Sequence, residues 1–476
     1  MRLHVDGSVL RDEHGRHRVL HGINMVHKGE PGAVGAADFR GSWTAADIAD
    51  LAGRGFTAVR LGVIWAAVEP EPGRYDEDYL DWVAEQLDAF ASAGIGVILD
   101  SHQDLYSQSF GDGAPAWATL ADAEFAATDL WSDAYLTSAA VHQGLDAFWA
   151  NAPGPGEVGL QERFAAMWGY LARRFGAHPA LIGYDILNEP TPGSDAETIF
   201  GALIGAFAHA TGQDPSQTAA DFGDPEAKFA QLGRLDDVAV HRQVGDAVAP
   251  FLAAFEAEAV APLMQRVTEA IRAADPAGLV LREHSYFANL GVPSGQPPLD
   301  DPAWVYSPHG YDLTVDTPAI ALSSNTRAGT IFARHRETQD RLGVPVLVGE
   351  WGAFEVAPGV AGHARFLLDL FDSYGWSWTY WCWSDGFAGS EAAAVMARPR
   401  PLAVAGDDLS WQVSESAFRA RWDGRDAAAP SEFWIPDATG ARLDLRRDGA
   451  TVPVHRDGAR VRVDAGTGRY ELTATW

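Results

Sequence analysis

The sequence has little of several residue types, and each shortage excludes a class of protein. Its single cysteine, Cys382, rules out an intramolecular disulfide and a zinc site built from cysteines. Only two lysines occur, Lys28 and Lys228, and the formal net charge is −30. Because nucleic-acid binding and attachment to an anionic membrane both depend on an excess of Lys and Arg, we expect neither.

Long apolar runs are also scarce. No stretch reaches the roughly 20 apolar residues that a membrane-spanning helix needs, and Met1–Leu10 lacks the apolar centre of a signal peptide. We therefore expect a soluble chain, and the sequence leaves open whether a leader has been removed. Aromatic residues, by contrast, make up 11% of the chain and include 17 Trp, which suits a folded protein that stacks on sugar rings.

Short apolar runs alternate with longer amphipathic stretches over the first 390 residues. Eight strands that alternate with helices predict an α/β fold, the (β/α)8 TIM barrel, with insertions. The predicted strands are Val19–Met25, Ala58–Val63, Gly96–Ser101, Leu181–Leu187, Leu279–Glu283, Trp304–Ser307, Val346–Gly349 and Trp376–Trp383, and the predicted helices are Ala45–Gly53, Glu77–Ala93, Leu160–Arg174, Val244–Ala274, Arg327–Arg341 and His363–Tyr374.

The pattern changes beyond residue 390. Short alternating strands such as Arg442–Arg446, Arg460–Val463 and Tyr470–Ala474 are separated by Asp-Gly and Gly-Thr-Gly turns. We predict a catalytic barrel over 1–390 and, over 391–476, a linker and a small C-terminal antiparallel β-sandwich domain.

Two long insertions interrupt the predicted barrel, at 107–151 and at 191–243. They follow the third and fourth strands, so we expect both at the carboxyl end of the barrel, where TIM-barrel active sites lie. The first insertion is rich in aromatic residues, and the second has apolar residues at helical spacing from Ile199 to Phe207. Two interpretations of the second are open: a helix that packs its own apolar stripe on the barrel, or a lid or lipid-facing wall.

Two glutamates follow predicted strands at the same end. Glu189 stands in Leu187-Asn188-Glu189-Pro190, and Glu350 stands in Val348-Gly349-Glu350-Trp351. Two carboxyl groups that face one glycosidic bond are the catalytic unit of most glycoside hydrolases. A polar turn would explain Asn188-Glu189-Pro190 taken alone, but the second strand-terminal glutamate favours a sugar-cleaving active site.

Further polar residues end the second and sixth strands. Arg60 is expected to keep the Glu350 carboxylate ionised by charge pairing, and Tyr311 to orient it with a hydrogen bond. His309 follows the sixth strand as well. The alternative for each is structural: a surface arginine for Arg60, and buried core residues for His309 and Tyr311.

The third and eighth strands end in candidate sugar-binding residues. His102 and Asp104 follow the third strand, and Trp381 alternates with Trp383 on one face of the eighth. A metal site at His102 and Asp104 was considered and is not predicted, because no further cluster of ligands accompanies them. We expect one of the two tryptophans to form the floor of the sugar site.

Taken together, these residues resemble the motif of glycoside hydrolase family 5, and within it the endoglycoceramidases. The family motif is matched, in strand order, by Arg60, His102, Asn188-Glu189, His309, Tyr311, Glu350 and Trp381. The endoglycoceramidase likeness lies in Gly22–Lys28, with a sugar-contacting lysine, in His102-Gln103-Asp104, and in Arg398–Gly406, which resembles the linker into a C-terminal sandwich.

The resemblance implies a retaining enzyme that cleaves the β-glycosidic bond between an oligosaccharide and ceramide, without metal or cofactor. It implies Glu350 as nucleophile and Glu189 as acid and base. It also implies a monomer that contacts a membrane or micelle only transiently, and secretion, although the chain shows no leader and a cytoplasmic location stays open. The substrate-binding residues that it implies are Lys28, His102, Asp104, Asn188, His309, Tyr311 and Trp381.

Other functions share the same catalytic residues. The continuation Gly29–Gly32 and the insertion after Pro190 differ from the best-known endoglycoceramidases, so oligogalactosylceramide and glucosylceramide are alternative substrates. A family 5 glucosylceramidase, β-glucosidase or endo-β-glucanase is the main alternative. A non-catalytic carbohydrate-binding protein on a decayed barrel is disfavoured, because decay would be expected to remove one of the glutamates.

Overall fold

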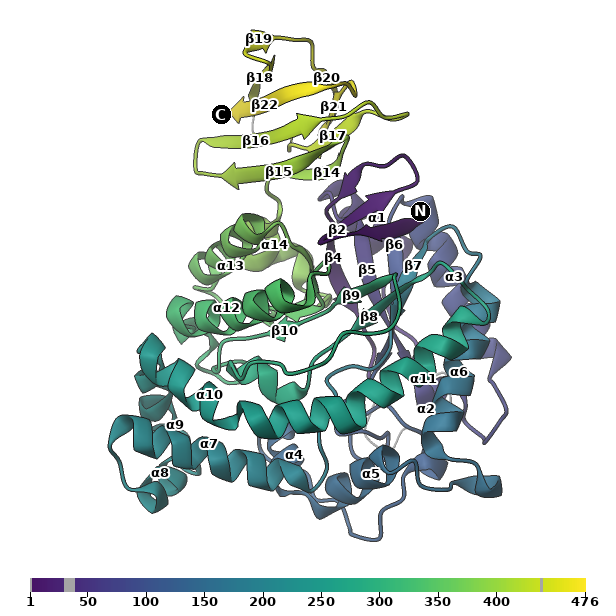
Figure 1. The fold of residues 1–476 in the computed structure, drawn as a ribbon, viewed down its shortest axis with the longest axis vertical. Helices are drawn as coiled ribbons and strands as arrows, with labels where there is room; N and C mark the ends of the chain where they lie inside the picture. Colours follow the sequence, from purple (N-terminus) through teal and green to yellow (C-terminus); the bar gives the residue numbers. More distant parts are fainter. Residues whose placement is uncertain (1, 30–38, 437–439) are drawn as a thin grey trace.

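The computed structural model describes residues 2–29, 39–436 and 440–476. Eight parallel strands form one sheet in the order β11-β13-β4-β5-β6-β7-β8-β9, and a bridge between Tyr306 and Val346 joins its two edges. This closed barrel confirms the predicted fold (Figure 1). The strands are β4 (His21–Met25), β5 (Ala58–Ile64), β6 (Gly96–His102), β7 (Leu181–Asp185), β8 (Leu279–Arg282), β9 (Trp304–Tyr306), β11 (Leu347–Val348) and β13 (Ser377–Tyr380).

Amphipathic helices surround the barrel. The first begins with a capping box, in which Thr44 and Asp47 each accept a hydrogen bond from the other's backbone. The helices with predicted counterparts bury their apolar stripes in the barrel core, as the helical periodicity predicts. They are α1 (Ala45–Gly53), α3 (Glu77–Ser92), α6 (Leu160–Phe175), α11 (Ala261–Arg272), α12 (Asn325–Leu342) and α13 (Ala361–Tyr374).

One helix is longer than predicted. Helix α10 (Val238–Phe255) runs through a π-helical segment (Glu256–Val260) directly into α11. The combined helix is long and apolar enough to cross a membrane by length and composition, although the sequence analysis found no such run. Its residues Val248, Leu252 and Leu263 are buried, and core helices often have this length and composition.

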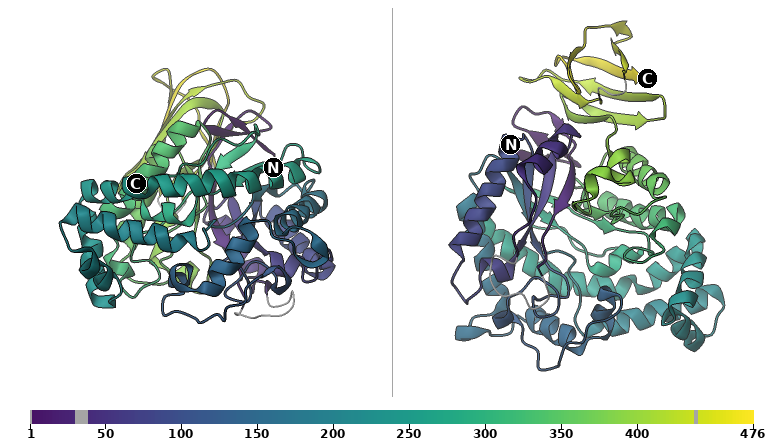
Figure 2. Two further views of the ribbon diagram at one scale, coloured as in Figure 1. Left: turned by 60° about the horizontal axis from the view of Figure 1, so that its bottom comes forward. Right: turned by 180° about the vertical axis from the view of Figure 1, so that it is seen from behind.

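Both insertions fold into short helices at one end of the barrel (Figures 1 and 2). The first contains α4 (Ala134–Thr137) and α5 (Ala139–Trp149), and the second contains α7 (Asp195–Thr211), α8 (Pro215–Phe222) and α9 (Pro225–Leu232). Residues of α7 share a hydrophobic cluster with α10. The second insertion therefore packs its apolar stripe on a neighbouring helix, and part of the same stripe also lines the cavity described below.

Two antiparallel sheets at the C-terminus form the predicted sandwich. Trp411, Phe418 and Phe433 belong to the hydrophobic cluster that these strands build. The seven-stranded sheet has the order β1-β2-β3-β14-β17-β21-β20, and the five-stranded sheet has the order β15-β16-β22-β18-β19. Their strands are β1 (Leu3–Asp6), β2 (Val9–Asp12), β3 (His17–Arg18), β14 (Arg400–Val404), β15 (Gly406–Val413), β16 (Ala417–Gly424), β17 (Ser431–Trp434), β18 (Arg442–Arg447), β19 (Ala450–Thr451), β20 (His455–Asp457), β21 (Arg460–Val463) and β22 (Gly468–Thr475).

The sandwich includes two segments that the sequence analysis placed elsewhere. Arg398–Gly406 was interpreted as a linker, but it contains β14, which pairs with β17 on one side and β3 on the other. The N-terminal strands β1–β3, grouped with the barrel in the sequence analysis, complete the same sheet. Their pairing satisfies backbone groups of β14 that would otherwise form an open sheet edge.

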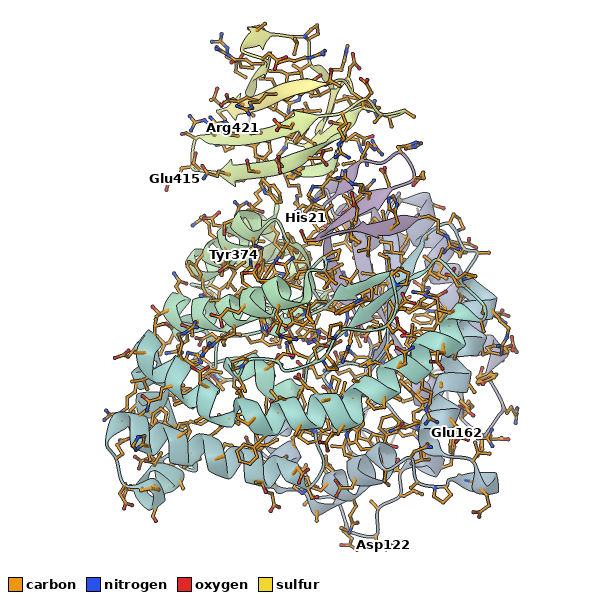
Figure 3. The ribbon with its side chains drawn as sticks, in the orientation of Figure 1. His21, Asp122, Glu162, Tyr374, Glu415 and Arg421 are labelled. Atoms are coloured by element: carbon orange, nitrogen blue, oxygen red, sulfur yellow. The ribbon has the colours of Figure 1, made fainter. Side chains whose placement is uncertain are left out.

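The sandwich and the insertions lie at opposite ends of the barrel. Strand β3 ends shortly before β4 begins, so the sandwich lies where the barrel strands start. His21, the first residue of β4, is close to this junction (Figure 3). The insertion helices lie at the other end, where the strands finish.

Candidate active site

Glu189 and Glu350 meet at the carboxyl end of the barrel. Glu189 follows β7, and Glu350 begins the short strand β12 (Glu350–Trp351), which pairs with β10 (His309–Gly310) so that His309 lies beside Glu350. Both glutamates are buried, and one carboxylate oxygen of each lies within 4.8 Å of the other. The two carboxylates are therefore close enough to face one glycosidic bond.

Arg60 is the buried centre of the site. Its Nη1 donates to Glu350 Oε1 at 2.8 Å and to Asn24 Oδ1 at 3.0 Å, and its Nη2 donates to Asn188 Oδ1 at 2.9 Å. Three further carboxylates surround the same guanidinium, those of Asp100, Asp185 and Glu283, at 2.8, 2.8 and 2.7 Å. Although burial lowers the pKa of Arg60, these four acidic neighbours raise it well above its usual value.

Tyr311 and His309 hold the two glutamates. The Tyr311 hydroxyl donates to Glu350 Oε2 at 2.5 Å. His309 Nδ1 lies 3.0 Å from Glu189 Oε1 and 3.5 Å from Glu350 Oε2, and its Nε2 lies 3.3 Å from Glu283. Burial lowers the pKa of His309, but the charges of Glu283 and Glu350 and the hydrogen bond to Glu189 raise it well above its usual value. His309 is therefore a cation between the carboxylates at neutral pH.

Glu189 is fixed from several sides. Burial raises its pKa, but the hydrogen bond and charge of His309, and a hydrogen bond that Asn289 donates to Oε1 at 2.6 Å, lower it overall. Its backbone N–H donates to Glu283 at 2.7 Å, and its φ of +42° is uncommon for a residue with a side chain.

Four of the predicted sugar-binding residues form one wall. Lys28 forms an ion pair with Asp104, and its Nζ lies 4.7 Å from the centre of the Trp381 ring. His102 stacks on the same ring at 5.0 Å. Trp381 rather than Trp383 contacts this group, so it is the tryptophan placed to form the floor of the site.

Both glutamates and the four residues of this wall border one cavity of about 580 Å³, whereas Arg60 and His309 are not among its lining residues. The cavity continues away from the glutamates between apolar residues of the second insertion and α10. The polar lining includes Lys28, His102, Asp104, Asn188, Glu189, Tyr311, Glu350 and Trp381, and the apolar lining includes Phe200, Leu203, Ile204, Phe207, Phe222, Leu232, Leu235 and Val244.

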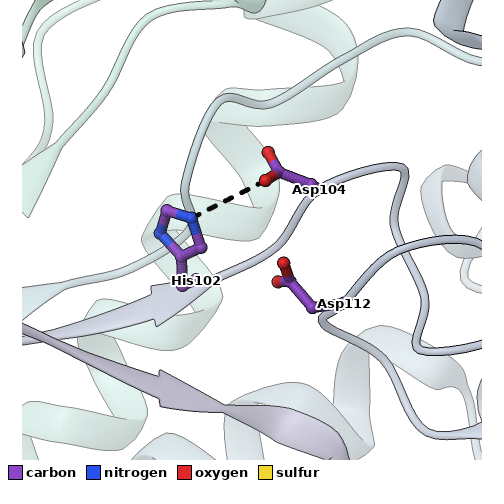
Figure 4. A group of neighbouring side chains, drawn as sticks. All are labelled: His102, Asp104 and Asp112. Atoms are coloured by element: carbon purple, nitrogen blue, oxygen red, sulfur yellow. Dashed lines mark ion pairs between the residues drawn. The ribbon is translucent and has the colours of Figure 1, made fainter. Parts of the chain in front are cut away.

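Among the described residues, three groups of acidic and histidine side chains are close enough to consider as metal ligands. Each group already contacts a cation of the protein. Figure 4 shows the group of His102, Asp104 and Asp112. Lys28, which lies outside that view, pairs with Asp104. Arg60 pairs with the group of Asp100, Asp185 and Glu283, and His309 is itself the cation in the group with Glu189 and Glu350.

Several residues of the site had no predicted role, among them Asn24, Asp100, Asp185, Glu283 and Asn289. Glu283 was the last residue of a predicted strand, so the rule that singled out Glu189 and Glu350 could have found it. Asn289 lies in a short 3-10 helix, Tyr286–Leu290, and had no periodic signal.

Known proteins share this sequence pattern. Residues 27–386 match the model of the cellulase family, glycosyl hydrolase family 5. Endoglycoceramidase I from Rhodococcus hoagii (strain 103S) is 26% identical over 456 residues, which are 91% of this chain and 80% of that protein.

Solved structures agree over the whole chain. Endo-glycoceramidase II from Rhodococcus sp., in complex with a five-membered iminocyclitol, is 26% identical with a TM-score of 0.75, over 99% of each chain. The same protein with ganglioside GM3 is 25% identical with a TM-score of 0.75, over 99% of each chain. Its lactosyl-enzyme intermediate is 25% identical with a TM-score of 0.75, over 98% of this chain and 99% of that one. An endogalactoceramidase is 25% identical with a TM-score of 0.69, over 100% of each chain. With most of its length matching the family model, this chain belongs to glycoside hydrolase family 5.

Proposed function

We propose that this chain is a retaining endoglycoceramidase, which hydrolyses the β-glycosidic bond between an oligosaccharide and ceramide. One observation carries the proposal: a single cavity holds the paired glutamates in its polar part and side chains of α7, α8 and α10 in its apolar part. A glycosphingolipid has this polarity, with sugar on one side of the cleaved bond and hydrocarbon on the other. The similar proteins named above act on or bind this class of lipid, which supports the same conclusion.

The proposed reaction has two steps. Glu350 attacks the anomeric carbon while Glu189 protonates the departing ceramide oxygen, giving a glycosyl ester and free ceramide. Glu189 then deprotonates a water molecule, which attacks the same carbon and releases the sugar with its configuration retained. Arg60 and Tyr311 each donate a hydrogen bond to one carboxylate oxygen of Glu350 and so orient it, and His309 keeps a proton one hydrogen bond away from Glu189.

We assign the sugar next to the cleaved bond to the polar part of the cavity. Lys28, Asp104 and Asn188 offer an ammonium, a carboxylate and an amide to its hydroxyl groups, and the Trp381 ring offers a stacking surface. His102 packs behind this ring. The ceramide chains are assigned to the apolar part, because burial of hydrocarbon there is favourable at roughly 25 cal/mol per Å².

We also propose that the enzyme is a monomer that meets membranes or micelles transiently, and that the chain passes from the barrel into the C-terminal part of the sandwich near residue 390. Leu322 and Val356 are 73% and 61% exposed, and each follows a loop that lines the cavity, at Thr317 and Glu355 respectively. Exposed apolar side chains at this position favour brief contact with a lipid surface. Light scattering of the purified protein would test the monomer.

The alternative with the same catalytic residues is a family 5 enzyme that cuts soluble β-glucosides or β-glucans. Turnover of lactosylceramide and of cellotriose, each with and without detergent, separates the two functions. The proposal predicts release of intact lactose from lactosylceramide in detergent and little cleavage of cellotriose. The reverse preference would contradict the proposal. If lactosylceramide is cleaved, a panel of gangliosides, glucosylceramide and galacto-series lipids would show which glycans the enzyme accepts.

A further inference from the structure

Asp112 is an acidic residue of the site for which the reaction above has no role. It lies in the first insertion and is 1% exposed, and neither carboxyl oxygen has a hydrogen-bond partner among the residues that the structure describes. One of its oxygens lies within 4.8 Å of a ring nitrogen of His102 and of an oxygen of Asp104. Figure 4 shows the carboxyl group pointing toward the space between them. Because an unpartnered buried acid is destabilising, its presence here indicates a function.

The backbone around Asp112 is built to bring it close to the end of β6. Its N–H donates to the carbonyl of Asp104 at 3.1 Å. A Cβ at Gly111 would lie 2.5 Å from the same carbonyl oxygen, and a Cβ at Gly113, where φ is +114°, would lie 2.6 Å from Gln103 Cβ. Glycines on both sides therefore permit an approach that side chains would prevent.

The charges near Asp112 indicate how it acts. Burial and the charge of Asp104 raise the pKa of Asp112 well above its usual value. Burial lowers the pKa of Lys28, but Asp104 and Asp112 oppose this and raise it overall, so Lys28 is an ammonium. His102 is neutral, because burial lowers its pKa to about 3, and its Nδ1 lies 2.8 Å from Asp100.

We propose that Asp112 is a positioning residue for sugar recognition, which holds the Lys28 ammonium and the Asp104 carboxylate in place against the hydroxyl groups of the sugar next to the cleaved bond. This inference rests on the proposed function. Lys28 and Asp104 line the cavity, whereas Asp112 is not among its lining residues, so Asp112 acts through its neighbours.

The test compares shortened and isosteric variants at this position. Asp112→Ala should raise KM for an aryl β-lactoside about tenfold while kcat changes less than about threefold, because ground-state binding is lost rather than the chemical step. Asp112→Asn, which keeps the shape and a neutral hydrogen-bonding group, should stay within about threefold of wild type. Asp122→Ala is the matched control, since Asp122 is an exposed acid of the same insertion (Figure 3), and it should behave as wild type.

A double-mutant cycle shows whether the effect passes through Lys28. In a Lys28→Met background, Asp112→Ala should change KM by less than about twofold, because the effects of residues that act as one unit are not additive. Three results would overturn the proposal: the effects of Lys28→Met and Asp112→Ala on KM multiply, KM is unchanged in Asp112→Ala, or Asp112→Asn and Asp112→Ala cause equal losses. Asp112→Ser is a second shortened variant in case the alanine variant does not fold.

Calorimetric binding of a disaccharide-like iminosugar provides a readout that needs no turnover. Asp112→Ala should weaken this binding about tenfold, in parallel with KM; unchanged binding would contradict the role of Asp112. A wild-type enzyme that cleaves no β-glycoside would instead reject the proposed function, and the binding data would still decide the role of Asp112.

Discussion

Although burial raises the pKa of Glu189, the contacts of His309 and Asn289 with its Oε1 lower it overall, which favours the carboxylate that acts as base in the second step. We predict that Glu189→Ala lowers kcat for lactosylceramide roughly 10²- to 10⁴-fold, the usual contribution of general acid–base catalysis. The loss should be smaller for an aryl lactoside with a good leaving group. Azide should restore turnover and yield β-lactosyl azide.

The azide product is the decisive readout of that variant. Rescue with retention requires that azide enters the space left by Glu189 and attacks the anomeric carbon of the glycosyl-enzyme intermediate, on the face opposite to Glu350. An unrescued variant with the same loss on both substrates would contradict the assignment of Glu189.

Glu283 predicts a pH dependence of stability. Burial and the charge of Asp185 raise its pKa from the ordinary value of 4.5 to about 8, in spite of His309 and Arg60. Between these two pH values the folded protein keeps a proton that the unfolded chain releases. The contribution of Glu283 to the free energy of unfolding therefore falls as pH rises and is lost once the pH passes about 8.

Glu283→Gln should remove this dependence. The amide is neutral at every pH, so the free energy of unfolding of the variant should fall less steeply with pH than that of wild type, by up to about 1.4 kcal/mol per pH unit. Urea denaturation at pH 5, 7 and 9 measures both slopes. Identical slopes would show that Glu283 is not protonated in the folded state.

The sequence was sufficient to predict the site residues that end strands, but not the carboxylates that surround Arg60. Glu350, Tyr311 and His309 were predicted because a parallel barrel brings all its strand ends to one side. The stagger of neighbouring strands determines which acids contact one arginine, and the hydrophobic periodicity of the sequence does not specify this stagger. One physical signal was available: an arginine in a fully apolar strand requires buried carboxylates nearby.

At the scale of elements, α7 has two tasks, since it packs on α10 and lines the cavity. We predict that Phe200→Asp lowers kcat/KM for lactosylceramide roughly tenfold or more, because the half-buried Phe200 side chain would be covered by the lipid, and burial of a Phe side chain contributes about 1.5–3 kcal/mol. Turnover of a soluble aryl lactoside should stay within twofold. Gly201→Asp is the control, because a Cβ at this exposed position meets nothing within 4 Å.

Parallel losses on both substrates would show that Phe200 supports the fold rather than the lipid.

The two interpretations of this insertion could not be separated from sequence, because the same apolar stripe serves a helix contact and a cavity wall. The strands and outer helices were predictable from period and length alone. The pairing of β3 with β14 was not, because strands nearly 400 residues apart are joined by edge complementarity.

At the scale of the whole molecule, the sandwich lies at the end of the barrel remote from the glutamates. Arg400 joins the two parts: it is buried, donates to the carbonyl of Arg54 at 3.0 Å, and lies over the rings of Trp434 and Phe56 at 5.2 and 5.7 Å. We predict that Arg400→Leu lowers the free energy of unfolding by about 2–4 kcal/mol, from unsatisfied carbonyls and lost cation–π contacts.

KM and kcat at 25 °C should be unchanged in that variant, since the junction does not contact the cavity. Arg421→Leu, on the exposed face of β16, is the matched control for both measurements. A changed KM in Arg400→Leu would show that the sandwich influences the active site.

The central claim is that Glu189 and Glu350 act on one anomeric carbon with Glu350 as the nucleophile. Incubation with 2-deoxy-2-fluoro-β-lactosyl fluoride, followed by peptide mass spectrometry, tests it most directly. We predict one covalently bound fluorolactosyl group, located on Glu350 and absent from Glu350→Ser. A label on any other residue, or lactose released from lactosylceramide with inverted configuration, would contradict the account.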